Sequence, residues 1–326
     1  MKAVVCKQYG PPESLVIEER PSPQAGPGQV VISVKAANVS FPDTLVIQNK
    51  YQTKQELPFI PGSEVAGVVK AVGAGIEDWK PGDRVSAPAL NGGYAEEVVA
   101  DASRLLAVPD QMDFASAAVL GSAYGTSYYG LTERGQLRAG ETLMVLGASG
   151  GVGLAAVEIG KALGARVIAC ASSATRLAVC RAHGADETID YVADDMRARV
   201  KAITKGNGVD VVYDPVGGPY SELALRDMAW GGRFLVVGFA AGEIPKIPLN
   251  LPLIKGCSIV GVWIGAFARR DRARHRANVV ELGRWFQEGK IKPHISATFP
   301  LERAADALNA LSQRKVIGKV VLTSGV

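Results

Sequence analysis

A short glycine-rich segment near the middle of the chain constrains the fold more than any other feature. It reads Leu146-Gly147-Ala148-Ser149-Gly150-Gly151-Val152-Gly153, directly after the apolar run 142–146 and directly before an amphipathic stretch, 152–163. A strand that turns through glycines into a helix binds phosphate, because the bare backbone permits close approach and the helix N-terminus offers unpaired amide groups. The segment therefore predicts an α/β unit with a phosphate site at this turn.

The spacing Ala148-x-Gly150-x-x-Gly153 matches the dinucleotide fingerprint except at its first glycine. An ordinary tight turn is the alternative, but strand, turn and helix follow in the order that a dinucleotide site needs. We therefore expect the diphosphate of a dinucleotide to bind here. The predicted contacts are Ser149, Gly150, Gly151, Val152 and Gly153.

Length and composition indicate a globular protein with two domains. A chain of 326 residues is long for a single core, and 48% hydrophobic with 21% charged residues is typical of a soluble protein. The net charge is only +4, and the densest basic cluster, 269–276, contains Asp271 and is typical of a solvated helix start. We find no signal-peptide or membrane-spanning pattern, and the four cysteines form no C-x-x-C pair. These features predict a cytoplasmic protein without nucleic-acid or membrane partners.

Strand and helix patterns alternate through the second half of the chain. This is typical of a doubly wound parallel sheet, that is, a Rossmann domain. The six strand candidates are 142–146, 166–170, 187–191, 209–213, 233–237 and 258–262. The first 120 residues instead show short β-rich runs separated by Pro and Gly, which predicts a compact, largely antiparallel β-domain. Another strand, 316–322, ends the chain, so we expect residues 1–121 and 266–326 to form the β-rich domain and 122–265 to form the nucleotide-binding domain.

The end of the second strand of this unit points to NADP(H). An acidic residue about 20 positions past the first glycine binds the ribose 2′-hydroxyl in NAD enzymes. Here that region reads Ala171-Ser172-Ser173 and holds no acid. Small hydroxyl residues leave room for a 2′-phosphate, and Arg176 can supply a positive charge, although it can also be a solvent-facing helix residue. Tyr191 adds a further hydroxyl.

Several motifs together resemble the zinc-free quinone oxidoreductase branch of the medium-chain dehydrogenase/reductases. They cover essentially the whole chain in order: Ser40-Phe41-Pro42-Asp43-Thr44, Asn49-Lys50-Tyr51, Pro61 to Gly67, Asn91 to Glu96, Gly147 to Gly153, Tyr213 to Gly218 and Gly318 to Leu322. The resemblance implies a GroES-like β-domain, a Rossmann domain, an active site in the cleft between them, NADPH as cofactor and commonly a homodimer. Lys319, in the last motif, is a cofactor contact expected on the same basis.

The sequence also departs from its relatives at informative positions. Zinc-dependent relatives carry histidine where this chain has Ser63, and no cysteine lies between Cys6 and Cys170, so we expect no metal. Members of the zinc-free branch usually carry asparagine three residues before the aspartate, where this chain has Ser40, and glycine where it has Asn49.

Three residues are candidates for catalysis of hydride transfer to an electron-poor acceptor. The acceptor develops negative charge on oxygen and then needs a proton. Tyr51 follows Asp43 by eight residues, the spacing of the proton-donating tyrosine in related enoyl-thioester reductases, although it can equally be a tyrosine at the cleft rim. Ser40 can donate a hydrogen bond, while Asp43 is expected to brace a loop. Thr126 matches a family position that faces the nicotinamide amide, with a packed helix threonine as the alternative.

Residues at the ends of the fifth and sixth strands should wall the nicotinamide pocket, because ligands bind at the carboxyl ends of parallel strands. These are Phe239, Ala240 and Trp263, the last of which can also be plain core. The expected function is an NADPH-dependent, zinc-independent reductase of a quinone or an α,β-unsaturated carbonyl. A reductase of an enoyl thioester such as acryloyl-CoA and a non-catalytic NADPH-binding protein remain alternatives.

Overall fold

The chain forms two compact units in a computed structural model that describes residues 1–88 and 92–325. Unit 1 comprises Met1–Gly121 and Pro293–Val326, and unit 2 comprises Ser122–Lys292. The first boundary coincides with the one expected at 121. The second lies at Lys292 rather than at 265, so the segment 266–292 belongs to unit 2.

Side-chain contacts explain why this segment stays with unit 2. The ring of Trp285 packs edge-on against Tyr128 at a centroid distance of 5.4 Å. Arg274 forms an ion pair with Glu133. Both partners, Tyr128 and Glu133, lie in the helical segment that begins unit 2, and these contacts hold the segment 266–292 to that unit.

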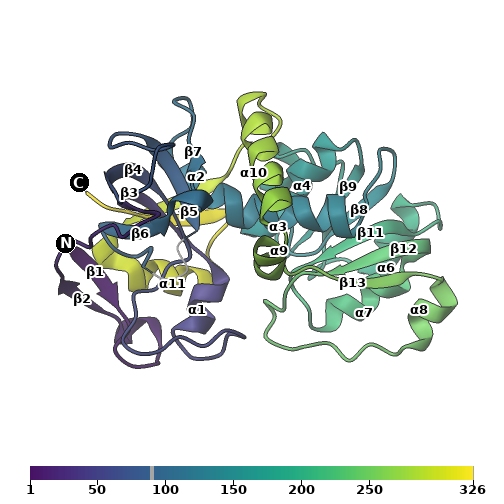
Figure 1. The fold of residues 1–326 in the computed structure, drawn as a ribbon. Coiled ribbons are helices and arrows are strands. Elements are labelled where there is room, and N and C mark those ends of the chain that lie inside the picture. Colours follow the sequence, from purple (N-terminus) through teal and green to yellow (C-terminus); the bar gives the residue numbers. More distant parts are fainter. Residues whose placement is uncertain (89–91, 326) are drawn as a thin grey trace. The chain divides into compact units, whose positions relative to one another are not determined.

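Unit 1 is built on a mostly antiparallel sheet of seven strands, as predicted for the first part of the chain (Figure 1). The last strand of the chain pairs antiparallel with an early one, with Val320 opposite Val39, so both ends of the sequence contribute strands to this sheet. A separate pair of strands, β1 (Lys2–Val5) and β2 (Val16–Glu19), is also antiparallel. The strands of the larger sheet are β3 (Gln29–Val39), β4 (Glu64–Val72), β5 (Arg84–Pro88), β6 (Glu97–Asp101), β7 (Leu106–Ala107), β14 (Ile295–Pro300) and β15 (Lys319–Thr323).

Short helices cover this sheet and close its apolar core. Buried side chains of the core include Ile32, Val65 and Leu322 on the strands, Leu105 directly before β7, and Leu308 on a helix. The helices are η1 (Pro12–Ser14), α1 (Phe41–Val46), η2 (Ala102–Arg104), α2 (Phe114–Val119), η5 (Leu301–Arg303) and α11 (Ala304–Ser312).

Unit 2 contains a six-stranded sheet in which every neighbouring pair is parallel. The spatial order is β10-β9-β8-β11-β12-β13, so the chain reverses its direction of travel across the sheet between β8 and β11. This is the doubly wound order of a Rossmann domain and confirms the predicted fold class. The strands are β8 (Thr142–Val145), β9 (Arg166–Ala171), β10 (Glu187–Asp190), β11 (Val209–Asp214), β12 (Met228–Val236) and β13 (Ser258–Gly261).

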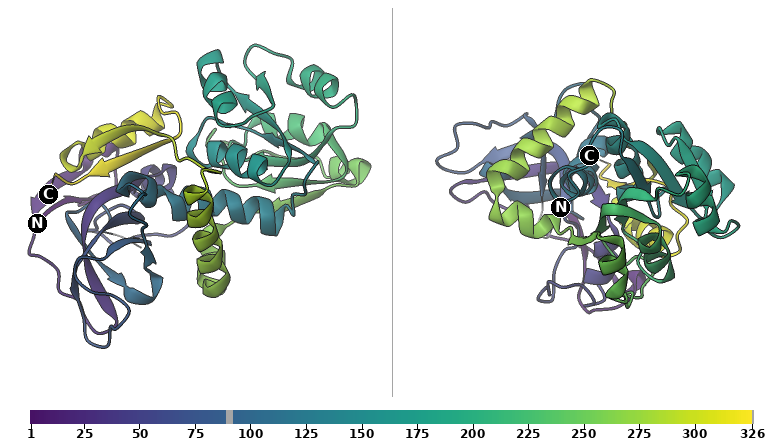
Figure 2. Two further views of the ribbon diagram at one scale, coloured as in Figure 1. Left: turned by 90° about the horizontal axis from the view of Figure 1, so that it is seen from above. Right: turned by 90° about the vertical axis from the view of Figure 1, so that its right-hand side faces the viewer.

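Helices cover both faces of the parallel sheet. α3, α4 and α10 pack together on one face, and α6, α7 and α8 pack side by side on the other (Figure 1, Figure 2). The helices of unit 2 are α3 (Gly125–Tyr128), η4 (Tyr129–Arg134), α4 (Gly151–Ala162), α5 (Ala174–Ala182), α6 (Met196–Ile203), α7 (Pro219–Arg226), α8 (Asn250–Lys255), α9 (Ile264–Arg270) and α10 (Arg272–Gln287). A further helix, η3 (Leu120–Tyr124), contains the boundary between the units. Within the described part of the chain, no helix combines the length and apolarity needed to cross a bilayer.

Candidate cofactor and acceptor sites

The predicted glycine turn joins β8 to α4 and can only be built from glycine at two positions. A Cβ on Gly153 would lie 2.3 Å from the carbonyl oxygen of Gly147, and a Cβ on Gly147 would lie 2.6 Å from Cγ2 of Val216. Gly147 also has φ +57°, which favours glycine. The turn is thus packed tightly against the start of its own helix and against a neighbouring loop.

The position of this turn in the sheet is that of a dinucleotide site. It follows the carboxyl end of β8, next to β11, where the strand order reverses. α4 begins at Gly151, so the amide groups of its first turn have no carbonyl partner within the helix. The backbone and the helix dipole can therefore receive the diphosphate of a dinucleotide.

Arg176 and three hydroxyl groups gather at the ends of the next two strands. The Arg176 guanidinium donates from Nη1 to the hydroxyl oxygen of Ser149 over 3.2 Å. Ser173 caps α5, and its hydroxyl oxygen accepts from the amide of Arg176 over 3.4 Å. Burial raises the pKa of the Tyr191 phenol, and a hydrogen bond with Ser172 partly offsets this. A guanidinium bonded to one hydroxyl group, with further hydroxyl groups at the ends of the neighbouring strands and no acid at the end of β9, has the chemistry to bind a 2′-phosphate.

A buried aspartate braces the loop beside the glycine turn, and sequence reasoning gave it no role. Oδ1 of Asp214 accepts from the amides of Val216 (2.8 Å) and Gly217 (2.9 Å), and Oδ2 accepts from the Ser221 hydroxyl over 2.5 Å. Burial raises the pKa of this carboxyl, and these hydrogen bonds oppose the rise. The bonds fix Val216 where it packs on Gly147. The sequence signal that could have pointed to this role is the run Asp214-Pro215-Val216-Gly217-Gly218 at the end of a strand.

A second missed feature links α3 to the first turn of α4. The Ser127 hydroxyl lies 2.7 Å from the carbonyl oxygen of Val152 and 2.9 Å from the Tyr213 hydroxyl, and both side chains are fully buried. Burial raises the pKa of the Tyr213 phenol. Ser127 has one hydroxyl proton, and the carbonyl oxygen of Val152 can only accept it, so Tyr213 is the donor between the two hydroxyls. Ser127 then donates to Val152. Next to it, the hydroxyl of Thr126 donates to the carbonyl oxygen of Ser122 over 2.7 Å, as a packed helix threonine does.

The predicted wall residues lie at the carboxyl ends of β12 and β13, as expected. Phe239 is 36% exposed and Trp263 is 48% exposed, so neither is plain core. The Arg269 guanidinium lies over the Trp263 ring at 5.5 Å. The amide of Ala240 donates to the carbonyl oxygen of Pro215 over 3.1 Å, which ties this wall to the loop braced by Asp214.

In unit 1, Asp43 is the centre of a buried polar cluster. Its Oδ2 accepts from the amide of Ser40 (2.8 Å), the hydroxyl of Ser40 (2.7 Å) and the hydroxyl of Tyr94 (3.1 Å). Burial raises the pKa of the Asp43 carboxyl, and the bonds from Ser40 and Tyr94 oppose this. Asp43 thus braces the start of α1, and the one hydroxyl proton of Ser40 is directed to it.

Lys319 and Glu64 belong to the same cluster. The Lys319 ammonium donates to the carbonyl oxygen of Val39 over 3.0 Å, and Nδ2 of Asn38 donates to Oε2 of Glu64 over 3.2 Å. Burial lowers the pKa of Lys319 to about 8, while Glu64 and Asp43 act in the opposite direction. These partners all lie in unit 1. The expected contact of Lys319 with a cofactor stays a prediction.

Tyr51 is half-buried in the bend after α1. Two residues earlier, Asn49 adopts φ +57°, a left-handed conformation. Glycine takes this conformation freely and asparagine tolerates it better than most residues, which explains how Asn49 replaces the usual glycine. The Asn91 to Glu96 motif begins at a residue outside the described part of the chain, but its Tyr94 lies in the Asp43 cluster.

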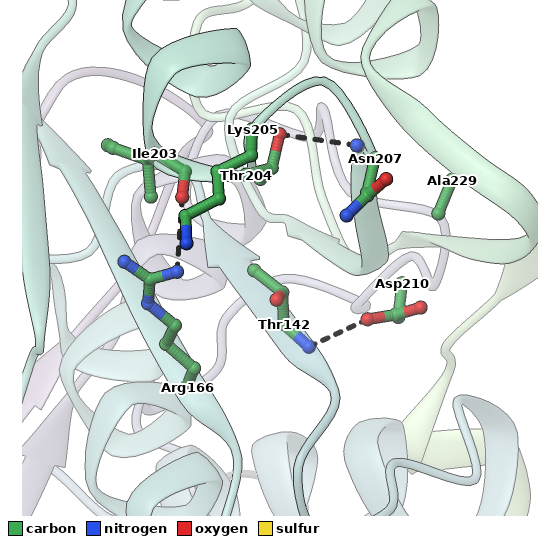
Figure 3. A pocket seen from close by; sticks show the side chains of 9 residues that line it. Thr142, Arg166, Ile203, Thr204, Lys205, Asn207, Asp210 and Ala229 are labelled. Carbon is green, nitrogen blue, oxygen red and sulfur yellow. Dashed lines mark hydrogen bonds between the residues drawn. The ribbon is translucent and has the colours of Figure 1, made fainter.

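A hollow of about 300 Å³ lies at the amino ends of the parallel strands, opposite to the carboxyl ends where the glycine turn lies (Figure 3). Thr142 and Arg166 begin β8 and β9, and the amide of Thr142 donates to Asp210 over 2.8 Å. Arg166 donates to the carbonyl oxygen of Ile203 over 3.1 Å. Several polar groups of this hollow therefore pair with one another, and the residues that line it do not include those of the glycine turn.

Comparisons with known proteins match both units of the chain to one family. Residues 26–110 match the alcohol dehydrogenase GroES-like domain family, and residues 151–281 match the family described as zinc-binding dehydrogenase. A quinone oxidoreductase-like protein 2 homolog from Nematostella vectensis is 39% identical over 99% of this chain and 89% of its own length.

Two solved structures complexed with NADPH are also similar. One is a mycobacterial protein, with TM-score 0.92, 32% identity and coverage of 99% of this chain and 100% of that chain. The other is Escherichia coli quinone oxidoreductase, with TM-score 0.92, 27% identity and the same coverage. Both support the cofactor predicted from the sequence. The chain therefore belongs to the quinone oxidoreductase branch of the medium-chain dehydrogenase/reductases, a family of oxidoreductases.

Proposed function

We propose that this protein is an NADPH-dependent, zinc-independent reductase that transfers hydride to a quinone or to an α,β-unsaturated carbonyl compound. The glycine turn with its Arg176–Ser149 contact carries the proposal, because it combines a diphosphate site with a guanidinium and hydroxyl groups for a 2′-phosphate. The two NADPH-bound relatives support the choice of cofactor.

The residues of unit 2 fit this cofactor and have separate tasks. The backbone from Gly150 to Gly153 would receive the diphosphate, and Ser172, Ser173, Arg176 and Tyr191 would hold the 2′-phosphate end. Phe239, Ala240 and Trp263 would wall the nicotinamide, with Thr126 as a partner for its amide. When bound, NADPH supplies the hydride, so the chain itself must orient the reactants and exclude water.

Residues of unit 1 would serve the acceptor. Reduction of a quinone or an enone places negative charge on oxygen, which needs a hydrogen-bond donor and then a proton. Ser40 directs its proton to Asp43, so Ser40 can offer a donor only if that bond is given up. We therefore propose Tyr51 as the first donor, since a phenol is protonated at neutral pH.

Oxidation of NADPH in the presence of several acceptors tests the proposed activity. We expect 1,4-benzoquinone, 9,10-phenanthrenequinone or a simple enone to be reduced, and Tyr51→Phe to lower that rate. Faster turnover of acryloyl-CoA than of the other acceptors would favour the enoyl-thioester alternative. NADPH binding without oxidation by any acceptor would favour a non-catalytic NADPH-binding protein and refute the proposal.

We further propose that the protein is a homodimer that pairs through β13. This strand ends the parallel sheet and bonds, among the described strands, only to β12. Apolar side chains lie exposed near it, including Ile259 on the strand (42% exposed), Trp230 (81%) and Leu253 (78%). An exposed edge with apolar neighbours favours pairing with a second copy, because a free edge of this kind invites association.

We also propose a cytoplasmic location. The four cysteines are unpaired thiols, three of them buried, which a reducing compartment preserves. Cell fractionation that finds the protein with secreted or membrane fractions would refute this.

A further inference from the structure

Lys319 is a buried lysine whose position near the predicted acceptor residues calls for an explanation. Its side chain lies in unit 1, and the residue is only 8% exposed. Lysine is rarely buried unless its charge is paired, because removing an ammonium group from water is costly. The sequence singles it out within the Gly318-Lys319 motif, but the activity proposed above gives it no task beyond an expected cofactor contact.

Strand pairing places Lys319 beside the start of α1. Val320 of β15 lies opposite Val39 of β3, and Val321 lies opposite Asn38. Lys319 precedes Val320, so it lies at the level of the residue after Val39, which is Ser40. Its ammonium group donates to the carbonyl oxygen of Val39 over 3.0 Å and thereby holds the backbone directly before Ser40.

The charges around Lys319 are mainly negative. Asp43 approaches from α1 and Glu64 from β4, and both carboxylates are buried and attract the ammonium group. Tyr94 faces the cluster from the loop after β5 through its bond to Asp43. On the remaining side, the backbone amide of Lys319 donates to the carbonyl oxygen of His294 over 2.8 Å. Without the ammonium charge, two carboxylates would remain in a buried space with no cation described beside them.

We infer that Lys319 is a positioning residue for acceptor reduction: its charge offsets Asp43 and Glu64, and its bond to Val39 fixes the backbone that carries Ser40. The inference rests on the proposed function, because it concerns the acceptor half of that reaction. It differs from a cofactor contact, since it places the action of Lys319 within unit 1.

Negative charge develops on the acceptor oxygen, and buried carboxylates without a counter-charge oppose it more strongly than they would in water. A charged Lys319 removes much of this opposition. Because burial lowers the pKa of Lys319 to about 8, the charge is lost within an accessible pH range. Glu64 and Asp43 remain as the groups that this charge offsets.

The test compares Lys319→Met, Lys319→Arg and the exposed control Lys315→Met with the wild type. For each protein, kcat and the KM for NADPH are measured with a quinone acceptor between about pH 6 and pH 10, and thermal melting checks folding. We expect the wild type and Lys315→Met to lose kcat as pH rises through about 8. Lys319→Met should have kcat lowered roughly tenfold or more at neutral pH. Its kcat should not fall further as pH rises, and its KM for NADPH should change little.

Lys319→Arg keeps its charge at every pH tested and should lack the alkaline fall while retaining much of the wild-type rate. If this larger side chain prevents folding, Lys319→Met decides alone, because it matches lysine in size without the charge. Unchanged kcat and an unchanged pH profile in folded Lys319→Met would overturn the inference, and so would a rise confined to the KM for NADPH. A wild type that reduces no acceptor would instead refute the proposed function, and the inference with it.

Discussion

Arg176 donates a hydrogen bond from its guanidinium to the hydroxyl of Ser149 and so connects α5 to the glycine turn. The two residues are separated by the whole of α4 and β9 in the sequence. Their contact joins the expected 2′-phosphate end of the site to its diphosphate end. Arg176 is therefore placed to influence both the choice and the affinity of the cofactor.

We expect Arg176→Gln to lower kcat/KM for NADPH while leaving kcat/KM for NADH nearly unchanged. The reason is the loss of a charge-assisted bond to the 2′-phosphate, which NADH lacks, and the expected loss is roughly ten- to a hundredfold. Steady-state kinetics with both cofactors measures the ratio. Arg199→Gln, an exposed arginine on α6, serves as the control. Equal losses for NADPH and NADH would contradict a role in selecting the phosphate.

Gly153→Ala should both destabilise the protein and weaken NADPH binding. The added methyl group would lie 2.3 Å from the carbonyl oxygen of Gly147, so the helix must move away from the turn. We expect a loss of about 2 kcal/mol or more in the free energy of unfolding. Chemical denaturation and cofactor titration measure the two effects.

Gly283→Ala provides the matched control for this substitution. Gly283 lies inside α10 with open space around its Cα, so alanine should stabilise the helix by about 0.5–1 kcal/mol. NADPH affinity should not change. Tolerance of both substitutions alike would show that the glycine turn has room for a methyl group at Gly153.

The local part of the fold could be predicted from the sequence, and the reason is physical. The inner strands of the parallel sheet, such as β8, β9 and β11, are short apolar runs that are mostly buried, and glycine or helix signals separate the runs. The apolar runs and the glycine or helix signals both depend only on residues that are close together in the sequence. The boundary at Lys292 could not be found in this way, because it depends on the packing of Trp285 against Tyr128, far apart in the chain.

The same limit applies to the candidate sites: their local motifs could be predicted from the sequence, and their long-range contacts could not. The turn from Ser149 to Gly153 is a local motif, and so is the absence of an acid at Ser172. The polar cluster of unit 1 depends instead on the register of β15 against β3, which brings Lys319 to Val39 across most of the chain. The spacing of residues within a local motif does not predict how β15 aligns with β3.

Ser127→Ala and Tyr213→Phe should show coupled effects. Each removes one side of a buried hydrogen bond, and Ser127→Ala also leaves the Tyr213 hydroxyl without its acceptor. We expect each change to cost about 1–3 kcal/mol in the free energy of unfolding, with the double variant less destabilised than the sum. Denaturant unfolding of the four proteins measures the coupling. Simple additivity would contradict the described link from β11 through Ser127 to Val152.

Ile259→Lys should convert the proposed dimer to a monomer. A charged side chain on an edge strand opposes pairing with another strand, because the ammonium group would have to be buried in the interface. Light scattering coupled to size-exclusion chromatography measures the mass. Val280→Lys, on the exposed face of α10, should leave the mass unchanged. A monomeric wild type would refute the dimer, and a dimeric Ile259→Lys would refute pairing through β13.

The stability of the wild type should rise relative to that of Lys319→Met as pH increases from about 8 to 10.5. Burial holds the pKa of Lys319 at about 8 in the folded protein, whereas the unfolded chain has the ordinary value of 10.5. Between these values the unfolded state binds more protons, so the free energy of unfolding increases with pH. Below pH 8 the cost of burying the charge is fully present.

The difference in the free energy of unfolding between the two proteins should change by up to about 3 kcal/mol between these two pH values, because one pKa unit corresponds to about 1.4 kcal/mol. Urea unfolding at a series of pH values measures it, and using the difference removes the contributions of other titrating groups. A difference that stays flat or falls with pH would show that Lys319 is not buried in its charged form.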